Sequence, residues 1–330
     1  MRAAVHNRYG APDVVSIRVV PVPAFDSYEL LVEVHASTIN RTDCHYRAAS
    51  PFPMRFFSGL WRPKPKIWGC EFAGRVAAIG DAVSNFTVGD RVFGYVEGRF
   101  GAHAEFLAIR ADRLITKIPD GCSYVDAAPV SEASHYAKTL LDLAKVTTGT
   151  DVLIYGASGG TGTAAVQLAR LAGAHVTAVC GTDGMQLVAS LGPDRVIDYT
   201  VDDFTVGGER YDAIVDAWGM LSFRRCARIM KPHCLFTSTG PGPHLQNLVL
   251  PFTTMLARRR VVFRPPKFDR ATLDRFAELL ADGALRAPID RTYPLENIVD
   301  AYRFVESGRK LGNVVLEIVS EDEDGSPKEE

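Results

Sequence analysis

The sequence predicts an α/β protein in which a doubly wound parallel sheet is joined to a second, strand-rich region. The first observation is that residues 151–172 run in the order strand, glycine turn, helix, and that strands and helices alternate after them. Such alternation is typical of a parallel sheet covered by helices. The second observation is that residues 1–120 contain short strands separated by turns, which predicts a compact antiparallel domain or partial barrel.

Each element follows from a short local pattern. In the first region, strands are expected at the apolar segments 30–36, 74–80, 88–94 (a turn and then a strand) and 104–109. A turn at 119–121 follows, and residues 125–144 are mostly helical. After the glycine turn, strands are expected at 174–179, 196–199, 212–216, 234–237 and 260–263, and helices at 223–230 and 273–281. A helix at 295–306 and a strand at 314–319 are expected to return to the first region.

The composition is that of an ordinary globular protein and excludes several classes of partner. The chain has 330 residues, of which 47% are hydrophobic and 23% are charged, and its formal net charge is -2. This length accommodates two domains. The near-neutral charge gives no reason to expect nucleic acid or an anionic membrane as a partner, and no apolar run reaches the length of a membrane span.

The cysteines and the chain ends favour a cytoplasmic protein. The six cysteines are scattered without C-x-x-C spacing, which argues against a disulfide framework and against a cysteine-rich zinc site. The first residues lead directly into a strand, without a signal-peptide pattern. The segment 320–330, SEDEDGSPKEE, is polar and acidic and predicts a disordered tail.

The glycine turn predicts a dinucleotide site. Residues 152–155 are an apolar run typical of a strand buried on both faces, and 163–172 have apolar residues at helical spacing. The turn between them has almost no side chains, and its candidate cofactor residues are Ser158, Gly159, Gly160, Thr161 and Gly162. Helix N-termini bind phosphate through free N–H groups, and glycines allow close approach. The alternative is a glycine-rich turn without a ligand, which the flanking pattern disfavours.

The end of the next strand favours NADP(H) over NAD(H). An NAD site carries Asp or Glu there to bind the ribose 2′-hydroxyl, whereas this chain has Cys180, Gly181 and Thr182. Without that carboxylate a 2′-phosphate is not repelled, and Gly181 and Thr182 are able to donate hydrogen bonds to it. We expect Tyr199 to reach the same phosphate and Gly240 to belong to the same cofactor site. Asp183 argues against NADP(H), because its negative charge disfavours a 2′-phosphate nearby.

Four motifs in order carry a family resemblance. They are N-R-T-D at 40–43, G-x-E-x-x-G at 69–74, V-G-D-R-V at 88–92 and G-A-S-G-G-T-G at 156–162. With the domain order, they resemble the medium-chain dehydrogenase/reductase superfamily, specifically its zinc-free quinone oxidoreductase (zeta-crystallin-like) branch. The resemblance covers residues 1–318. It implies a GroES-like β domain formed by 1–122 and 284–330, and a Rossmann domain at 123–283.

The resemblance also implies that the chain binds no zinc. Zinc-binding members hold the catalytic metal at places that look like Asn40, Cys70 and Val130 here. Asn40 and Val130 are not zinc ligands, and Cys70 alone cannot hold a metal and is otherwise a small core residue. The four-cysteine lobe of those members would follow Tyr95, where this chain has no cysteine.

Three candidate catalytic residues follow from the same resemblance. Asn40 matches an Asn on the nicotinamide side of the cleft, and we expect it to orient the substrate oxygen. His45 stands where a Tyr is frequent, and we expect it to donate a proton or hydrogen bond; the alternative is a surface residue near a turn. Ser134 takes the place of a nicotinamide-contacting Thr. Glu132 and His135 replace small residues, which leaves the substrate open and predicts a more polar pocket.

The resulting hypothesis is an NADPH-dependent, metal-free reductase of quinones or α,β-unsaturated carbonyl compounds, because such acceptors need no Lewis acid. One alternative is an enoyl-thioester reductase, which needs a basic patch for a carrier phosphate, with Arg55, Arg62, Lys64 and Lys66 as candidates. Another is a non-catalytic NADPH-binding regulatory or structural protein. We expect a small-molecule substrate and, through the apolar strand near 261–263, a homodimer.

Overall fold

The computed structural model describes residues 1–319 except 51, 53–54, 65 and 99. The predicted disordered tail at 320–330 lies outside the described residues. The chain divides into two compact units, and both are discontinuous. The first unit is Met1–Glu132, Asp269–Ala281 and Ile289–Glu330, and the second unit is Ala133–Phe268 and Asp282–Pro288.

The unit boundaries differ from the expected ones at three places: 123–132 and 269–281 belong to the first unit, and 284–288 belongs to the second. Packing explains the first two. The first unit extends to Glu132 rather than 122, because α3 (Tyr124–Ala127) packs on its sheet. The Tyr124 ring stacks on His35, with 4.2 Å between ring centroids. Helix α9 (Arg270–Ala281), predicted from its apolar spacing, joins the first unit because it packs on β7 (Ile115–Lys117).

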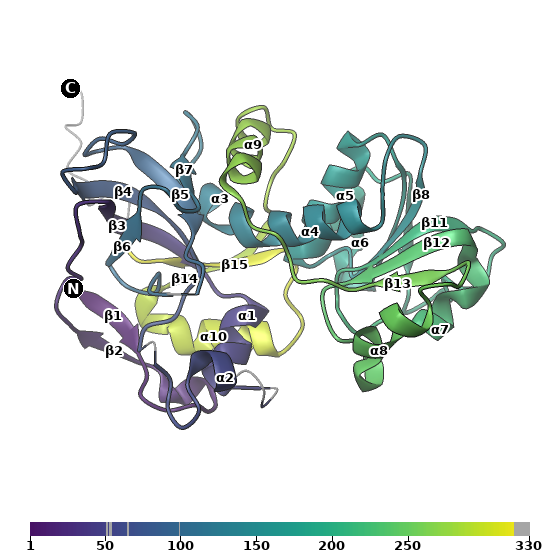
Figure 1. The fold of residues 1–330 in the computed structure, drawn as a ribbon, viewed down its shortest axis with the longest axis horizontal. Helices are drawn as coiled ribbons and strands as arrows, with labels where there is room; N and C mark the ends of the chain where they lie inside the picture. The colour runs from purple at the N-terminus through teal and green to yellow at the C-terminus, as the bar shows by residue number, and fades with distance from the viewer. Residues whose placement is uncertain (51, 53–54, 65, 99, 320–330) are drawn as a thin grey trace. The chain divides into compact units, whose positions relative to one another are not determined.

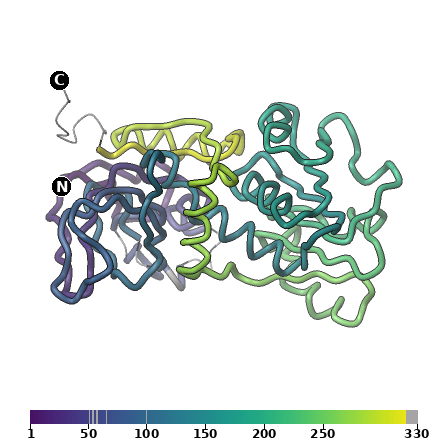
Figure 2. Tube along the Cα trace, turned by 90° about the horizontal axis from the view of Figure 1, so that it is seen from above, coloured from purple at the N-terminus to yellow at the C-terminus, as the bar shows by residue number. Residues whose placement is uncertain are grey.

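The first unit is built on a seven-stranded sheet in the order β14-β15-β3-β4-β5-β7, with β6 also paired to β3. Its strands are β3 (Glu29–Thr38), β4 (Glu71–Ile79), β5 (Arg91–Tyr95), β6 (Phe106–Arg110), β7, β14 (Ile289–Pro294) and β15 (Asn313–Glu317). Strand β15 pairs antiparallel with β3, so the C-terminal part of the chain returns beside the N-terminal part (Figure 2). The predicted strand-rich, GroES-like domain is confirmed.

Helices and a small sheet complete the first unit. Strands β1 (Arg2–Val5) and β2 (Ser16–Val19) form a two-stranded antiparallel sheet. The helices besides α3 and α9 are α1 (Arg41–Ala48), α2 (Arg55–Ser58) and α10 (Ile298–Glu306). The core of this unit includes Leu30, Val32 and Phe72 from the sheet, and Ile298 and Tyr302 from α10.

The second unit is a parallel six-stranded sheet in the order β10-β9-β8-β11-β12-β13 (Figure 1). Its strands are β8 (Asp151–Tyr155), β9 (His175–Cys180), β10 (Arg195–Asp198), β11 (Tyr211–Asp216), β12 (Met230–Ser238) and β13 (Arg260–Val262). Ile154 belongs to the core on one face and Leu153 to the core on the other, so the sheet is buried on both sides. The predicted doubly wound sheet is confirmed.

The helices of the second unit flank this sheet. They are α5 (Gly160–Leu171), α6 (Met185–Ala189), α7 (Phe223–Cys226) and α8 (Gln246–Thr253), together with most of α4 (Ser131–Leu143). The helix expected over 223–230 is shorter, because a 3-10 turn follows α7 and β12 already begins at Met230. Within the described part of the chain, no helix combines the length and apolar character that a membrane span requires.

Candidate active site

The glycine turn between β8 and α5 leaves room for a ligand on the helix N-terminus. Gly159 is the N-cap of α5 and has an extended backbone. A Cβ on Gly159 would meet the Gly156 carbonyl oxygen at 3.7 Å and nothing closer, whereas a Cβ on Gly162 would lie 2.1 Å from that oxygen. Gly162 therefore lets the helix pack against the strand, and Gly159 leaves open space beside the N–H groups of the first turn. The space at Gly159 has the form that a dinucleotide pyrophosphate requires, and Ser158, Gly160 and Thr161 lie in the same segment of the chain.

The residues expected to contact the 2′-phosphate lie together after β9 and β10. A Cβ on Gly181 would lie 3.3 Å from the Tyr199 hydroxyl. The Thr182 hydroxyl donates to Asp198 Oδ2 at 2.6 Å and lies 2.8 Å from the Thr200 hydroxyl. Hydrogen bonds from Thr182 and Thr200 hold the pKa of Asp198 below its ordinary value. The ionised Asp198 therefore binds the hydroxyl that was expected to serve the phosphate, and sequence reasoning missed this carboxylate.

Gly240 lies at the carboxyl end of the same sheet, beside the loop that follows β11. A Cβ on Gly240 would lie 2.6 Å from the carbonyl oxygen of Gly219 in that loop. The buried Asp216 holds the loop, because its carboxylate accepts three backbone N–H groups from 218–221 at 2.8–3.1 Å. It also accepts the Ser238 hydroxyl at 2.8 Å. An acidic residue at the end of a predicted strand was the available signal for Asp216.

Asn40 is held inside the first unit by the two carboxyl groups that flank it. It is the N-cap of α1, in a capping box with Asp43, whose Oδ2 accepts the Asn40 backbone N–H at 2.9 Å. Its side-chain nitrogen donates to Glu71 Oε2 at 2.7 Å and to Glu132 Oε2 at 2.9 Å. Both amide hydrogens thus have carboxyl acceptors. The expected contact of Asn40 with a substrate oxygen therefore competes with two hydrogen bonds inside the protein.

Glu71 and Glu132 form a buried carboxyl pair around Asn40. The Glu132 backbone N–H donates to Glu71 Oε1 at 2.6 Å, and the Thr42 hydroxyl donates to Glu132 Oε1 at 2.5 Å. Glu71 is fully buried and Glu132 is 4% exposed. Burial, and then the charge of Glu132, raise the pKa of Glu71 to about 8, and burial raises the pKa of Glu132. Because two neighbouring buried carboxyls do not both ionise readily, the pair retains a proton near neutral pH.

Asp43 extends this group, and we call Asp43, Glu71 and Glu132 the carboxyl cluster. Burial and the charge of Glu132 raise the pKa of Asp43 to about 8. The buried Cys70 has a pKa raised well above its ordinary value by burial and by Asp43, so it is a thiol rather than a thiolate. Among the residues that the structure describes, no group of three or more His, Cys, Asp or Glu is placed to hold a metal.

For the other two predicted catalytic residues, His45 and Ser134, no hydrogen bond to the carboxyl cluster is seen among the described residues. His45 is exposed on α1, and desolvation and the charge of Arg41 lower its pKa, so its imidazole is neutral at pH 7. Ser134 is buried on α4 and belongs to the second unit. Among the candidates, the structure thus groups Asn40 with Glu132, which the sequence marked only as a departure from the family pattern.

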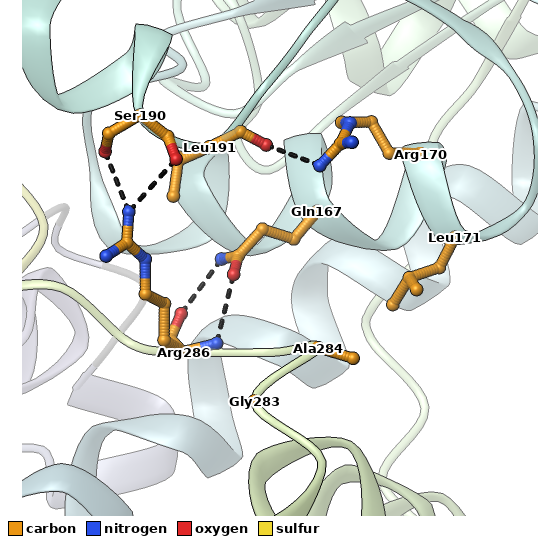
Figure 3. Close-up of a pocket in the computed structure, with 8 residues that line it drawn as sticks. All are labelled: Gln167, Arg170, Leu171, Ser190, Leu191, Gly283, Ala284 and Arg286. Carbon is orange, nitrogen blue, oxygen red and sulfur yellow. Dashed lines mark hydrogen bonds between the residues drawn. The ribbon is translucent and has the colours of Figure 1, made fainter.

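A surface pocket of about 450 Å³ lies at the opposite end of α5 from the glycine turn (Figure 3). Arg170 lies ten residues beyond Gly160, about 15 Å along the helix. Gln167 Nε2 donates to the Arg286 carbonyl at 2.9 Å, and Gln167 Oε1 accepts the Arg286 N–H at 3.0 Å. The guanidinium groups of Arg170 and Arg286 donate to Leu191 and Ser190. These paired groups attach the segment 282–288 to the second unit.

Comparison with known families places this fold among the oxidoreductases. Residues 26–120 match the alcohol dehydrogenase GroES-like domain, and residues 191–316 match the zinc-binding dehydrogenase family. The chain is 30% identical over 330 residues to quinone-oxidoreductase QR1, chloroplastic, of Triphysaria versicolor, covering 96% of this chain and 98% of that protein. It therefore belongs to the medium-chain dehydrogenase/reductase superfamily, in the zeta-crystallin-like quinone oxidoreductase branch.

Two further relatives extend this comparison. The NADPH-dependent alkenal/one oxidoreductase, chloroplastic, of Arabidopsis thaliana is 27% identical over 330 residues, with 96% of this chain and 79% of that protein covered. The solved structure of the quinone oxidoreductase from Coxiella burnetii superposes with a TM-score of 0.86 at 26% identity, over 97% of this chain and 99% of that one.

Proposed function

We propose that this protein is an NADPH-dependent reductase that delivers hydride to quinones or α,β-unsaturated carbonyl compounds, without a metal. The observation that carries the proposal is the glycine turn, where Gly159 leaves space for a pyrophosphate on the N-terminus of α5. Two relatives named for quinone and for alkenal/one reduction support the substrate class. The absence of Asp or Glu at 180–182 supports NADPH, as does the name of the second relative.

The proposed residues of each unit have separate tasks. Bound NADPH would supply the hydride. The first turn of α5 would bind the pyrophosphate through backbone N–H groups, and Gly181 and Tyr199 would lie beside the 2′-phosphate. An electron-poor acceptor needs only hydrogen bonds and a proton once hydride arrives. The donor set supports a metal-free site, because Asn40 and Val130 are not zinc ligands.

The test is loss of NADPH absorbance, with NADH in parallel, against a panel of quinones, conjugated enones and simple aldehydes. We expect turnover of quinones or enones that favours NADPH and is unchanged by a chelator. Turnover of aldehydes alone that a chelator abolishes would refute the metal-free assignment. Tight NADPH binding without turnover of any acceptor would instead support the non-catalytic alternative.

We also infer a cytoplasmic homodimer joined at the edge of the second sheet. Strand β13 is a terminal strand of that sheet, and α8 packs beside it. Helix α8 exposes apolar side chains, including Phe252, which is 80% exposed. An unpaired edge next to an apolar surface is suited to association with a second copy. Light scattering at micromolar concentration tests this, and a strictly monomeric particle would contradict it.

A further inference from the structure

We propose that the pocket at the C-terminal end of α5 binds a small organic phosphate between the guanidinium groups of Arg170 and Arg286. The pocket has a volume of about 450 Å³, and the residues that line it belong to the second unit. Arg170 lies about 15 Å along the helix from Gly160, so this place is separate from the glycine turn. The inference therefore goes beyond the proposed function and does not depend on it.

The two arginines reach the same short turn of the chain from opposite sides. Arg170 Nη1 donates to the Leu191 carbonyl at 2.8 Å. Arg286 Nη2 donates to the Ser190 carbonyl at 3.2 Å and to the Ser190 hydroxyl at 2.8 Å. Figure 3 shows the two guanidinium groups on either side of Gln167. Because they bind consecutive residues, both cations are held in place before a ligand arrives, which lowers the entropy cost of binding.

Both guanidinium groups keep donors that the protein does not use. A guanidinium has five N–H donors, and the contacts with the 190–191 turn occupy one nitrogen of Arg170 and one of Arg286. Both side chains are exposed. Among the residues that the structure describes, no carboxylate pairs with either arginine, and the pocket lining contains no Asp or Glu. The positive charge of this pocket is therefore available to an anion.

The helix ends beside the pocket offer little repulsion to an anion. A helix C-terminus carries partial negative charge on carbonyls that lack a donor. At the end of α5, the Gly173 N–H donates to the Arg170 carbonyl at 2.9 Å, and the Ala174 N–H donates to the Ala169 carbonyl at 3.1 Å. After α6, the arginines themselves bind the carbonyls of 190–191. The carbonyls at both helix ends thus have donors, and the two cations determine the charge of the pocket.

The arrangement of the cations favours a phosphate over a carboxylate. One guanidinium fork satisfies the two oxygens of a carboxylate, whereas a phosphate monoester presents three free oxygens to two guanidinium groups at once. A volume of about 450 Å³ is that of a small-molecule site and exceeds the size of a phosphate group alone. Leu171 is 51% exposed and Ala284 is half-buried in the lining, so both offer apolar contacts. We therefore expect the phosphate monoester of a small molecule.

Isothermal titration calorimetry with three probes tests this class of ligand. The probes are glycerol 3-phosphate, inorganic phosphate and succinate, each titrated with and without one equivalent of NADPH. Glycerol 3-phosphate should bind with a dissociation constant below about 1 mM in both conditions. Inorganic phosphate should bind more weakly, because it makes no apolar contact, and succinate should bind at least about tenfold more weakly. A parent protein that binds no NADPH would contradict the proposed function but not this one.

Variants of the pocket should remove this binding. Arg170→Gln and Arg286→Gln should each weaken glycerol 3-phosphate at least about tenfold. Arg195→Gln is the matched control, because Arg195 is an exposed arginine of the same unit on β10, and its variant should bind like the parent. Ala284→Trp should also abolish binding, because it fills the pocket and keeps both arginines. Thermal unfolding without ligand checks that each variant is folded.

Chemical modification of the parent protein locates the ligand without any variant. Glycerol 3-phosphate should slow the reaction of phenylglyoxal with Arg170 and Arg286, but not with Arg195, as measured by peptide mass mapping. Equal binding in the parent and both Gln variants, or no protection of these arginines, would overturn the proposal. Binding that one equivalent of NADPH abolishes would place the ligand at the nucleotide site and would also overturn it. Succinate that binds as tightly as glycerol 3-phosphate would refute the assignment to phosphate.

Discussion

The glycine turn of the second unit and the carboxyl cluster of the first unit are built in opposite ways. The turn depends on backbone groups that no side chain covers, whereas the cluster depends on side chains that bind one another. At the turn, the absence of side chains exposes backbone N–H groups, and a Cβ on Gly162 would lie 2.1 Å from a carbonyl oxygen. In the cluster, side chains bind one another, and Asn40 donates to both Glu71 and Glu132. The turn should therefore be sensitive to added volume and insensitive to pH. The cluster should tolerate substitutions that preserve shape and respond to protonation.

The largest expected effect is at the turn. Gly162→Ala should lower the free energy of unfolding by about 3 kcal/mol, because the added Cβ would overlap a backbone carbonyl that cannot move independently. Gly159→Ala is the matched control, since its Cβ has open space. It should leave stability within about 0.5 kcal/mol but weaken NADPH binding at least tenfold. Denaturant unfolding and nucleotide titration measure both quantities, and equal stability losses in the two variants would refute this division of roles.

The pH dependence of the free energy of unfolding tests the protonation of the carboxyl cluster. The pKa of Asp43 and of Glu71 is raised to about 8, so between the ordinary carboxyl range and pH 8 these groups are protonated when folded and ionised when unfolded. The unfolded state then binds fewer protons, and stability should fall as the pH rises to about 8 and level off above it. We expect a loss of at least about 1 kcal/mol between pH 5 and 8.

Glu71→Gln should flatten this slope, because it removes one of the groups with a raised pKa. Chemical denaturation at a series of pH values measures the slope in both proteins. Glu278→Gln, an exposed control, should leave it unchanged. A parent protein whose stability rises over the same range would show that these carboxyls are ionised in the folded state.

A smaller effect is expected at the residues proposed to contact the 2′-phosphate of NADPH. Thr182→Ala and Tyr199→Ala should raise the Michaelis constant for NADPH several-fold, about 1 kcal/mol each, through lost hydrogen bonds. Asp198→Asn should lower it, because an ionised carboxylate beside Thr182 repels a 2′-phosphate. The constants for NADH serve as the control. If neither Ala variant changes the NADPH constant, the phosphate binds elsewhere.

The smallest effect on stability is expected at an exposed group of ion pairs, which compares the contribution of surface charge with that of buried packing. Lys231 on β12 lies 2.5 Å from Asp151 and 2.8 Å from Asp212, but all three side chains are about a third or more exposed. Lys231→Met should therefore reduce stability by less than about 1 kcal/mol, and less in high salt. Thermal unfolding at two salt concentrations measures this. A loss of stability as large as that of Gly162→Ala would show that these exposed ion pairs stabilise the fold more than their exposure leads us to expect.

The sequence predicted the turn better than the cluster because the turn is local. Its glycines, flanking strand and helix occupy one continuous stretch, and the six parallel strands follow from similar apolar runs. The carboxyl cluster and its hydrogen-bond partners come from residues 38–43, 71 and 132, which only the pairing of β3 with β4 and the fold of 124–132 bring together. Because these residues lie far apart in the sequence, their arrangement was not predicted, although Glu132 was noted as a departure from the family pattern.

Among the described residues, α1, α2, α6 and α8 were missed; α2 and α6 have only four and five residues, and the two longer helices were missed for identifiable reasons. Helix α1 is polar over most of its length, so apolar spacing does not reveal it. Its capping box of Asn40 and Asp43 was the signal that could have located its start. Helix α8 contains Pro251 and exposes much of its apolar surface, and both features obscure a helical pattern.

The Gln167–Arg286 contacts have a consequence for producing either unit separately. The second unit is completed by 282–288, which the chain reaches only after forming α9 of the first unit. A fragment truncated at residue 268 would lack the backbone groups that pair with the Gln167 amide. Expression of the second unit alone should therefore require that the 282–288 peptide be supplied with it. A chain in which this peptide is joined directly to residue 268 is the rational starting point.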